Sequence, residues 1–313
     1  MLRKKFYKLL LFLFIFVIGC KEKKPINILV SIAPHQKVLK QIVQDKANIV
    51  RIFPKGNFIH NYKIIPAQES MFKAVDVYYT VGIPAEENWI KRIKSINKDI
   101  KIVNSTKDIK IRKLKSNGEL LKNMGLDSTK VRITRADAHG LHEVKESEIK
   151  NDIYTWMRPE NFQLQINHMV DDLKKIDNSN SSFYSRNLKE INNMLDSEFS
   201  KFQNTFEKVK KSKHIVTFDR NLGYLLDDYS ISQLPIFIES IRPNPGEISG
   251  IISQNTMFKT KAMFYNFQIS SKIAKEIERI SKTAVIQVDP FVEDYIGQMK
   301  RIRLHLDKSM EEK

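Results

Sequence analysis

Two residues of types that bind transition metals stand directly after predicted strands. His60 lies in a loop, residues 53–66, that follows the apolar segment 49–53. Asp289 follows the apolar segment 284–288. A divalent borderline ion accepts an imidazole nitrogen and a carboxylate oxygen, so this pair offers donors that suit Zn²⁺ or Mn²⁺. The alternatives are that His60 is a polar loop residue and that Asp289 is a turn or cap residue.

Catalytic motifs are not evident elsewhere in the sequence. The chain lacks a glycine-rich phosphate loop, a G-x-S-x-G nucleophile elbow and an H-E-x-x-H zinc motif. His35, at the start of a predicted helix, is interpreted as structural. His168 and His214 are interpreted as surface or packing residues. We therefore expect a binding protein and no enzyme.

The first twenty residues have the pattern of an export signal. A basic start precedes an apolar run at residues 9–18, which is shorter than the roughly 20 residues that span a bilayer. The run ends in Val17-Ile18-Gly19-Cys20, which resembles a bacterial lipobox with cleavage before Cys20 and lipid on its sulfur. Cys20 is the only cysteine, so no disulfide can form within one chain.

We therefore expect a lipoprotein signal peptide at residues 1–19 and a lipidated tether at residues 20–25. The protein would then be exported and membrane-anchored, facing the periplasm or the cell exterior. An ordinary signal peptide and an uncleaved anchor are the alternatives.

The net charge of +17 raises the question of nucleic-acid binding. The lysines are spread along the whole chain, however, and no basic cluster interleaved with aromatic residues stands out. We expect no nucleic-acid partner and a lysine-rich surface that favours anionic lipid headgroups. With 42% hydrophobic and 10% aromatic residues, the exported part can form one large or two medium globular domains.

Predicted strands and helices alternate, which favours parallel sheets covered on both faces. Strands are predicted at residues 26–32, 49–53, 75–81, 101–104, 215–218, 235–241, 262–267 and 284–288. Helices are predicted from residue 33, from 66, at 87–98, from 159, at 221–228, 246–254 and 270–281, and from about 293. The segment 107–151 is polar and weakly periodic, and we interpret it as a long surface excursion.

One long amphipathic helix is the clearest structural signal. Apolar residues recur at spacings of three and four from Tyr184 to Val209. A helix of about 28 residues would be about 42 Å long at 1.5 Å per residue. A coiled coil is the alternative, but it needs a partner chain, whereas new α/β segments follow this helix. We therefore expect a backbone helix that joins two lobes of one monomer.

Short motifs along the chain match one known family in their order and spacing. They are Ser31-Ile32-Ala33-Pro34; Gly56 with His60, Tyr62 and Pro66; Ala74-Val75-Asp76, Gly82, Glu87 and Trp89; Trp156, Pro159 and Asn161; Tyr184, Asn187 and Leu188; and Asp289-Pro290 with Tyr295 and Met299. From Ile28 to about Leu306 the chain thereby resembles the metal-specific, zinc- or manganese-binding periplasmic solute-binding proteins of ABC transporters.

The resemblance implies an α/β fold of two Rossmann-like lobes with parallel sheets, joined by one long rigid backbone helix, with a metal in the cleft between the lobes. On this basis we expect an N-terminal lobe at residues 26–179, the linking helix at 180–210 and a C-terminal lobe at 211–313.

The same resemblance implies four metal ligands, two from each lobe, drawn from His, Glu and Asp. His60 takes the first place and Asp289 the fourth. Tyr154 takes the second place and Phe218 the third, and both depart from the family pattern. Phenylalanine cannot bind a metal, and neutral tyrosine is a poor ligand because its reference pKa is about 10.

The first interpretation of this departure is that metal binds through His60, Asp289 and substitute ligands. Asp219 is one residue from the lost ligand, although on a strand it would point the other way. Many family members carry a histidine-rich metal-collecting loop in the region of His139 and His142, and a solvated loop explains these two histidines equally well.

Two other interpretations remain open. In one, His60, Tyr154 and Asp289 select a harder ion such as Fe³⁺, which can ionise a phenol. In the other, the cleft has lost metal affinity, and Phe218 and Tyr154 line a site for another small ligand or for none.

The resemblance implies an extracytoplasmic substrate-binding lipoprotein of a metal-ion ABC importer. Its transported ligand would be a Zn or Mn ion, and its partners would be the ABC permease subunits. The alternative is a degenerate family member that has lost metal binding and acts as a receptor for another small ligand or as an interaction or adhesin-like lipoprotein.

Overall fold

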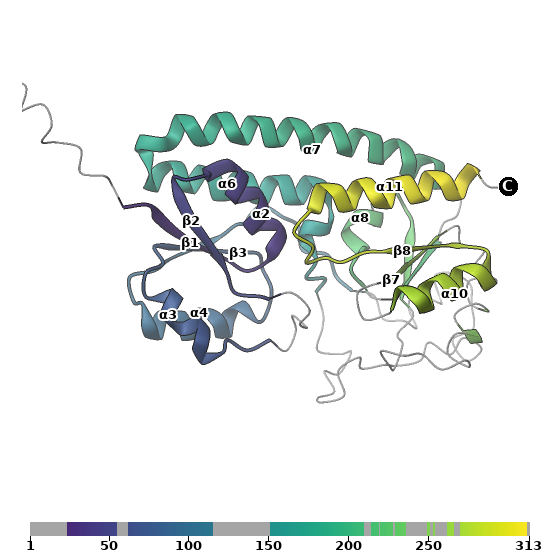
Figure 1. The fold of residues 1–313 in the computed structure, drawn as a ribbon, viewed down its shortest axis with the longest axis horizontal. Helices are drawn as coiled ribbons and strands as arrows, with labels where there is room; N and C mark the ends of the chain where they lie inside the picture. Colours follow the sequence, from purple (N-terminus) through teal and green to yellow (C-terminus); the bar gives the residue numbers. More distant parts are fainter. Residues whose placement is uncertain are drawn as a thin grey trace, which may run out of the picture.

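The computed structural model describes residues 24–54, 62–114, 151–209, 214–218, 220–227, 229–235, 249–250, 253, 262–265 and 270–311. These residues form two four-stranded parallel sheets at opposite ends of an elongated molecule, each covered by helices (Figure 1). The α/β class predicted from the alternation of elements is confirmed.

The first sheet has the strand order β2-β1-β3-β4. Its strands are β1 (Ile26–Val30), β2 (Ala47–Arg51), β3 (Val77–Thr80) and β4 (Lys101–Asn104). Helices α2 (Ala33–Val43) and α6 (Pro159–Ile176) cover one face, and α3 (Pro66–Phe72) and α4 (Glu86–Ile96) cover the other (Figure 1). Every residue of β3 is therefore buried, as expected for a central strand of a sheet covered twice.

The second sheet repeats this topology with the order β6-β5-β7-β8. Its strands are β5 (His214–Thr217), β6 (Ser232–Pro235), β7 (Ala262–Tyr265) and β8 (Ala284–Gln287). Helix α10 (Ser271–Ser281) lies on one side, and α8 (Gly223–Asp227) and α11 (Tyr295–Glu311) lie on the other (Figure 1).

The strand predicted at residues 235–241 begins three residues earlier than expected, at Ser232. Strand β6 begins at Ser232 and ends at Pro235, and residues 236–248 lie outside the described part of the structure. Proline lacks the backbone N–H that a residue inside a central strand donates. A proline in the sequence therefore suggests the first residue of a strand. Because β6 is an edge strand, Pro235 is tolerated within its ladder.

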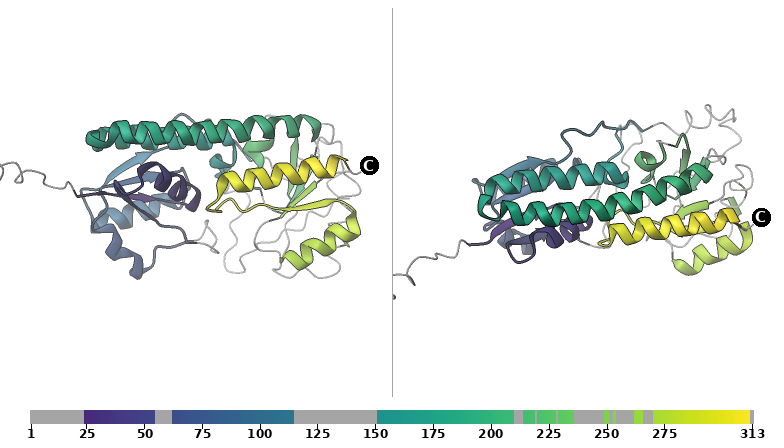
Figure 2. Two further views of the ribbon diagram at one scale, coloured as in Figure 1. Left: turned by 45° about the horizontal axis from the view of Figure 1, so that its top comes forward. Right: turned by 90° about the horizontal axis from the view of Figure 1, so that it is seen from above.

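Helix α7 (Ser181–Val209) is the predicted linking helix, with 29 residues. At 1.5 Å per residue it is about 43 Å long, and it lies side by side with α6 and α11, the first from one end of the molecule and the second from the other (Figure 2). Its buried hydrophobic residues fall on the predicted apolar face: Tyr184, Ile191, Leu195, Phe199 and Phe202. The chain's own helices cover this face, so it requires no partner chain.

The two ends of the molecule also meet at Trp156, in a 3₁₀ turn, η2 (Thr155–Met157), just before α6. The buried indole Nε1–H donates to the Pro290 carbonyl at 2.7 Å, and the Trp156 carbonyl accepts from the Tyr295 hydroxyl at 2.9 Å. The Tyr295 ring stacks on Phe162 of α6 at 4.0 Å between centroids. Side chains of α6 and α11 therefore share one core across the junction.

No helix in the described residues is long and apolar enough to cross a bilayer. Cys20 and the predicted signal peptide lie outside the described residues. The predicted lobe boundaries at residues 179 and 210 stay predictions, although α7 occupies the interval between them.

Replacing Tyr295 by phenylalanine is expected to destabilise the protein while keeping the ring stacked on Phe162. The change removes a buried hydrogen bond and leaves the Trp156 carbonyl without its donor, at a cost of about 1–3 kcal/mol. Urea unfolding followed by circular dichroism measures the difference. The control is Tyr265→Phe, because the Tyr265 hydroxyl makes no hydrogen bond with the described residues. Equal stabilities of the two variants would contradict the expectation.

Candidate metal-binding site

The topology locates the edge at which ligands bind in folds of this kind. In each sheet the strand order reverses between the two central strands, β1 and β3 in the first sheet and β5 and β7 in the second. Open α/β sheets bind ligands in the crevice outside the carboxyl ends of such strands. The candidate residues His60, Asp219 and Asp289 all follow carboxyl ends of strands in the sequence.

The chain before His60 contacts the second half of the molecule. His60 itself falls in residues 55–61, outside the described part of the chain. Before this gap, the Phe53 ring packs on Phe291 with centroids 4.8 Å apart. After the gap, Tyr62 packs edge-on against Phe53 at 5.4 Å. Phe53 therefore contacts the chain that follows β8 directly, whereas Tyr62 is connected to that chain through Phe53.

Asp289 lies in that same chain, two residues before Phe291. Its carboxylate Oδ1 accepts the N–H of Phe291 at 2.9 Å, and its own N–H donates to Gln298 Oε1 at 2.8 Å. Gln298 is buried, and its Nε2 has no hydrogen-bond partner among the described residues. Asp289 is partly exposed, and one of its carboxylate oxygens is held in a short turn.

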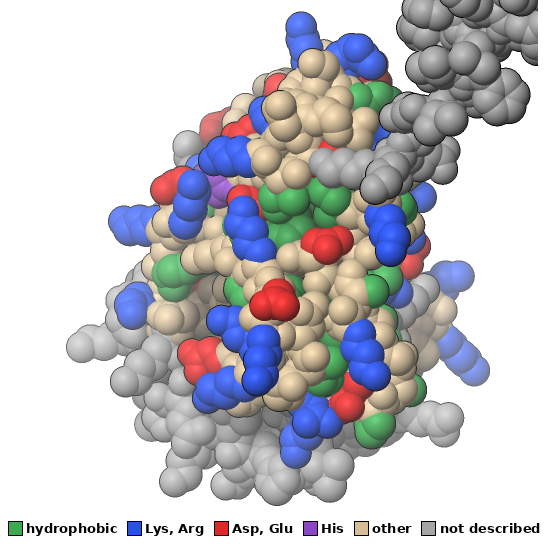
Figure 3. All heavy atoms as spheres, turned by 90° about the vertical axis from the view of Figure 1, so that its left-hand side faces the viewer, with side chains coloured by type: hydrophobic (Ala, Val, Ile, Leu, Met, Phe, Trp, Pro, Cys, Tyr) green, Lys and Arg blue, Asp and Glu red, His purple; other side chains and the backbone are tan. Residues whose placement is uncertain are grey.

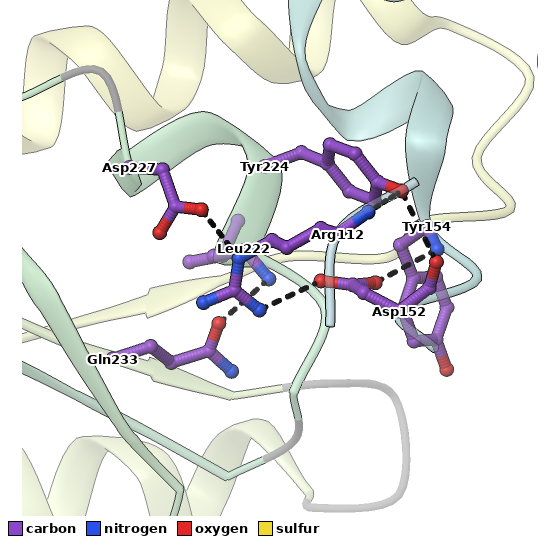
Figure 4. A network of polar contacts seen from close by, with 7 residues as sticks. All are labelled: Arg112, Asp152, Tyr154, Leu222, Tyr224, Asp227 and Gln233. Atoms are coloured by element: carbon purple, nitrogen blue, oxygen red, sulfur yellow. Dashed lines mark hydrogen bonds and ion pairs between the residues drawn. The ribbon is translucent and has the colours of Figure 1, made fainter. Parts of the chain in front are cut away.

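Tyr154 lies in the same aromatic junction. Its ring is buried and contacts Trp156 at 5.6 Å and Phe291 at 6.2 Å between centroids. Its backbone N–H donates to Asp152 Oδ1 at 2.9 Å (Figure 4). Phe291 thus contacts both Phe53 from the first sheet and Tyr154, which brings together the segments carrying the first, second and fourth predicted ligand positions.

Phe218 does not line this junction, which corrects the interpretation that it faces a ligand cleft. It is buried in an apolar cluster with Val216, Met263 and Ala274, between the second sheet and α10. Its backbone N–H donates to the Phe264 carbonyl at 2.8 Å. Side chains two residues apart on a strand share a face, so Phe218 joins Val216 in the core for the same geometric reason.

Glu86 is a buried acid that the sequence analysis missed in favour of its neighbour Glu87. Glu87 is exposed, whereas Glu86 is 4% exposed. The Glu86 carboxylate accepts the N–H groups of Val81, Gly82 and Ile83 at 2.9–3.2 Å and also contacts the Ser31 hydroxyl.

These partners follow β1 and β3, so the buried carboxyl stands at the point where the strand order of the first sheet reverses. Burial raises the pKa of Glu86, and the hydrogen bonds from Ser31 and the three backbone N–H groups oppose that rise. The Ser31-Ile32-Ala33-Pro34 motif together with the acidic start of α4 is the sequence signal that could have located this group.

His35 is confirmed as a structural residue. It is fully buried, its Nε2 lies 2.8 Å from Gln165 Oε1, and its ring is 5.1 Å from that of Phe162. Burial lowers the pKa of His35 to about 4, although the hydrogen bond with Gln165 raises it. The imidazole is therefore uncharged at neutral pH, and it packs in the protein core.

Among the described residues no group of three or more His, Cys, Asp or Glu side chains gathers as a ready metal cluster. His60, His139, His142 and Asp219 all lie outside those residues, so Tyr154 and Asp289 are the candidates whose surroundings the structure describes. On the face at the end of the first sheet, lysine and arginine side chains are interspersed with acidic ones (Figure 3). The charge of +17 is thus not concentrated on that face.

A family model described as "Zinc-uptake complex component A periplasmic", ZnuA, matches residues 28–307. A "Metal ABC transporter substrate-binding lipoprotein" of Lactococcus lactis is 21% identical over 85% of this chain and 81% of its own length. The "High-affinity zinc uptake system protein ZnuA" of Bacillus subtilis is 22% identical over 83% and 77% of the two chains. "Manganese ABC transporter substrate-binding lipoprotein PsaA" of Streptococcus pneumoniae is 21% identical over 77% and 72%.

The fold is shared with solved structures of similar proteins. A crystal structure of ZnuA superposes with a TM-score of 0.70 at 20% identity, covering 92% of this chain and 100% of that one. At this identity the similarity supports the two-lobed architecture and does not identify the metal ligands.

Replacing Glu86 by glutamine should change how stability depends on pH. Because burial raises the pKa of Glu86 above its ordinary value of 4.5, the folded protein keeps this proton at pH values where the unfolded chain has lost it. Relative to Glu86→Gln, the wild type should lose stability as pH rises from 4.5 to the raised pKa, by at most about 1.4 kcal/mol per pH unit.

Urea unfolding of both proteins across that pH range tests this, and the titration of His35 cancels because both proteins retain it. The exposed neighbour provides the control, since Glu87→Gln removes a carboxyl group outside the buried network. Parallel curves for Glu86→Gln and the wild type would show that the buried carboxyl has an ordinary pKa.

Proposed function

The chain belongs to the ZnuA family of periplasmic zinc-uptake components, and from this membership we propose that it is the extracytoplasmic substrate-binding subunit of a metal-ion ABC importer. Its transported ligand is a divalent transition metal, Zn²⁺ or Mn²⁺. The proposal extends to this chain what the names of its zinc- and manganese-transporting relatives state for them.

One observation carries the proposal, namely the contact between the carboxyl ends of the two sheets. Phe53 follows β2 and Phe291 follows β8, and their rings pack at 4.8 Å. An ion pair between Arg51 and Glu293 at 3.0 Å spans the same two segments. The loop that contains His60 and the turn that contains Asp289 therefore adjoin residues that are in contact with each other.

We propose His60 and Asp289 as metal ligands on this basis. Only two peptide units separate His60 from Tyr62, so its Cα lies within about 7 Å of the Tyr62 Cα. Tyr62 in turn packs on Phe53, beside Phe291. An imidazole nitrogen and a carboxylate oxygen suit either ion, and the aromatic surroundings limit competition from water.

We propose Asp219 as a further ligand from the second sheet. It directly follows Phe218, whose side chain points into the core. Neighbouring side chains of an extended segment point to opposite sides, so a buried Phe218 favours a carboxylate at residue 219 that faces away from that core. Tyr154 completes the wall of the site with its ring, and His139 and His142 belong to the proposal only as metal-collecting residues.

Metal analysis of the purified protein tests the ligand set. The wild type should retain close to one equivalent of Zn²⁺ or Mn²⁺ after dialysis, and His60→Ala or Asp289→Ala should each reduce this strongly. Adding metal should raise the melting temperature of the wild type, because an ion at 100 times its Kd stabilises the native state by about 2.7 kcal/mol.

Matched surface variants separate ligand loss from general damage. His305→Ala and Asp99→Ala remove exposed side chains of the same types and should leave metal content and melting temperature unchanged. Asp219→Ala tests the third ligand, and Tyr154→Phe keeps the ring while removing the phenol. A wild type that holds no metal and shows no thermal shift with either ion would refute the proposal.

We further propose that Cys20 carries the lipid that anchors the protein and that the ABC permease subunits are its partners. The relatives from Lactococcus lactis and Streptococcus pneumoniae are named as lipoproteins. A single cysteine directly after a basic and apolar leader has the context that lipidation needs.

Replacing Cys20 by serine should move the protein from the membrane fraction to the soluble fraction of expressing bacteria, because the thiol that accepts the lipid is gone. Metal binding by the released protein should be unchanged. Fractionation and immunoblotting measure this, with Ser271→Ala, at an exposed serine, as a control that retains Cys20. Persistence of the serine variant in the membrane fraction would indicate an uncleaved anchor instead.

A further inference from the structure

A second link between the two sheets involves Arg112, which the sequence analysis did not single out. Arg112 lies in the chain that leaves β4, and Asp152 lies on the returning chain beside it, with Asp152 N–H donating to the Arg112 carbonyl at 2.9 Å. The Arg112 guanidinium donates to Asp152 Oδ2 at 3.2 Å and to Asp227 Oδ2 at 2.6 Å (Figure 4). Asp227 is the last residue of α8, so one cation connects both chains to the second sheet.

Tyr224 of α8 reinforces the link through the backbone. Its hydroxyl accepts the Arg112 N–H at 2.8 Å and donates to the Asp152 carbonyl at 3.3 Å. The contact therefore has a charged part and a neutral part, and both connect α8 to the same pair of residues (Figure 4).

The network is buried enough for its charges to matter. The Asp152 side chain is inaccessible to solvent and that of Arg112 is 18% exposed. Burial alone would lower the pKa of Arg112, but the carboxylates of Asp227 and Asp152 outweigh burial and raise it. Exposed ion pairs contribute little, whereas removing one partner of a buried pair leaves an uncompensated charge and is strongly destabilising.

The approach of α8 to this network depends on a glycine. A Cβ atom on Gly223 would lie 2.3 Å from the Arg112 guanidinium and 2.6 Å from Asp152 Oδ2. Gly223 lies in a helix, where alanine is intrinsically more favourable. Helix propensity alone therefore predicts that Gly223→Ala stabilises the protein, whereas the close approach to Arg112 and Asp152 predicts that it destabilises the protein.

The network continues into the aromatic junction. The second oxygen of the Asp152 carboxylate accepts the N–H of Tyr154 at 2.9 Å. The Tyr154 ring contacts Trp156, and the Trp156 indole donates to the carbonyl of Pro290, which follows Asp289. A displacement of Asp152 would therefore be transmitted to the wall of the proposed metal site within a few contacts.

We propose that Arg112, Asp152 and Asp227 form an interlobe clasp, in which Arg112 is a positioning residue that fixes the spacing of the two sheets and thereby the geometry of the metal cleft. The clasp and the Phe53–Phe291 contact use different segments of the chain. The clasp uses the chain that follows β4, and the Phe53–Phe291 contact uses the chain that follows β2. Its role in metal binding rests on the proposed function, whereas its role in holding the sheets together does not.

Distances between spin labels measure the clasp directly. The full chain with Cys20→Ser has no native cysteine, so labels attach only at Lys94→Cys on α4 and Lys275→Cys on α10, both exposed positions. The protein with an intact clasp should give one narrow distribution by double electron–electron resonance. Arg112→Gln and Gly223→Ala should each broaden or shift it, and Asp227→Asn should do so to a smaller extent because its carboxylate is 55% exposed.

Arg279→Gln provides the matched control. It breaks an exposed ion pair with Glu276 on α10, far from the junction, and should leave the distribution unchanged. If Arg112→Gln does not fold, Gly223→Ala and Asp227→Asn still decide the matter, since both variants retain Arg112 itself. Distributions identical to that of the parent in both of these variants would overturn the clasp.

Metal titration of the same variants tests the positioning role. Arg112→Gln and Gly223→Ala should weaken the affinity for Zn²⁺ or Mn²⁺ by about 10–100-fold with the stoichiometry unchanged, as found when groups that orient metal ligands are removed. Altered distances with unaltered affinity would overturn the positioning role. A wild type that binds neither ion would refute the proposed function, and the distance measurement would then decide the clasp alone.

Discussion

The packing of Trp156 between the two sheets is the interaction on which the rest of the structure depends. Its indole N–H is satisfied by the Pro290 carbonyl and its own carbonyl by the Tyr295 hydroxyl, so a large side chain is buried without an unpaired polar group on the indole. Phe291 and Tyr154 pack on the same ring. Because Trp156 also begins the approach to α6, its position couples the helices above the first sheet to the turn that carries Asp289.

Much of the fold follows from local patterns that the sequence states clearly. Continuous apolar runs such as 28–30 and 77–79 are buried on both faces, and the regular spacing along α7 identifies its length within a residue or two. Sequence patterns predict strand bounds less well at the edge of a sheet, where proline is tolerated. Pro235 looks like the start of a strand because a central strand cannot use it, but at the edge of the second sheet it ends one.

The site is less predictable, because its geometry depends on which of two neighbouring side chains points inward. Glu86 and Glu87 are equivalent in a linear reading, yet Glu86 turns back to accept three backbone N–H groups while Glu87 is exposed. The same question arises for Phe218 and Asp219 after β5, and Phe218 is the residue that is buried in the apolar cluster around Val216. Long-range pairs such as Arg112 with Asp227 lie 115 positions apart, and periodicity carries no information about them.

The polar links across the junction differ in a way that bears on function. Arg51 and Glu293 pair at a surface where Glu293 is 60% exposed, so that link contributes little and can open at low cost. Arg112 and Asp152 pair inside, where separation would remove the Arg112 cation from a carboxylate that is inaccessible to solvent. The polar link beside Phe53 is therefore weaker than the polar link beside Tyr154. A rigid junction with one weak edge is sufficient for a receptor that must admit a small ion without a large closure.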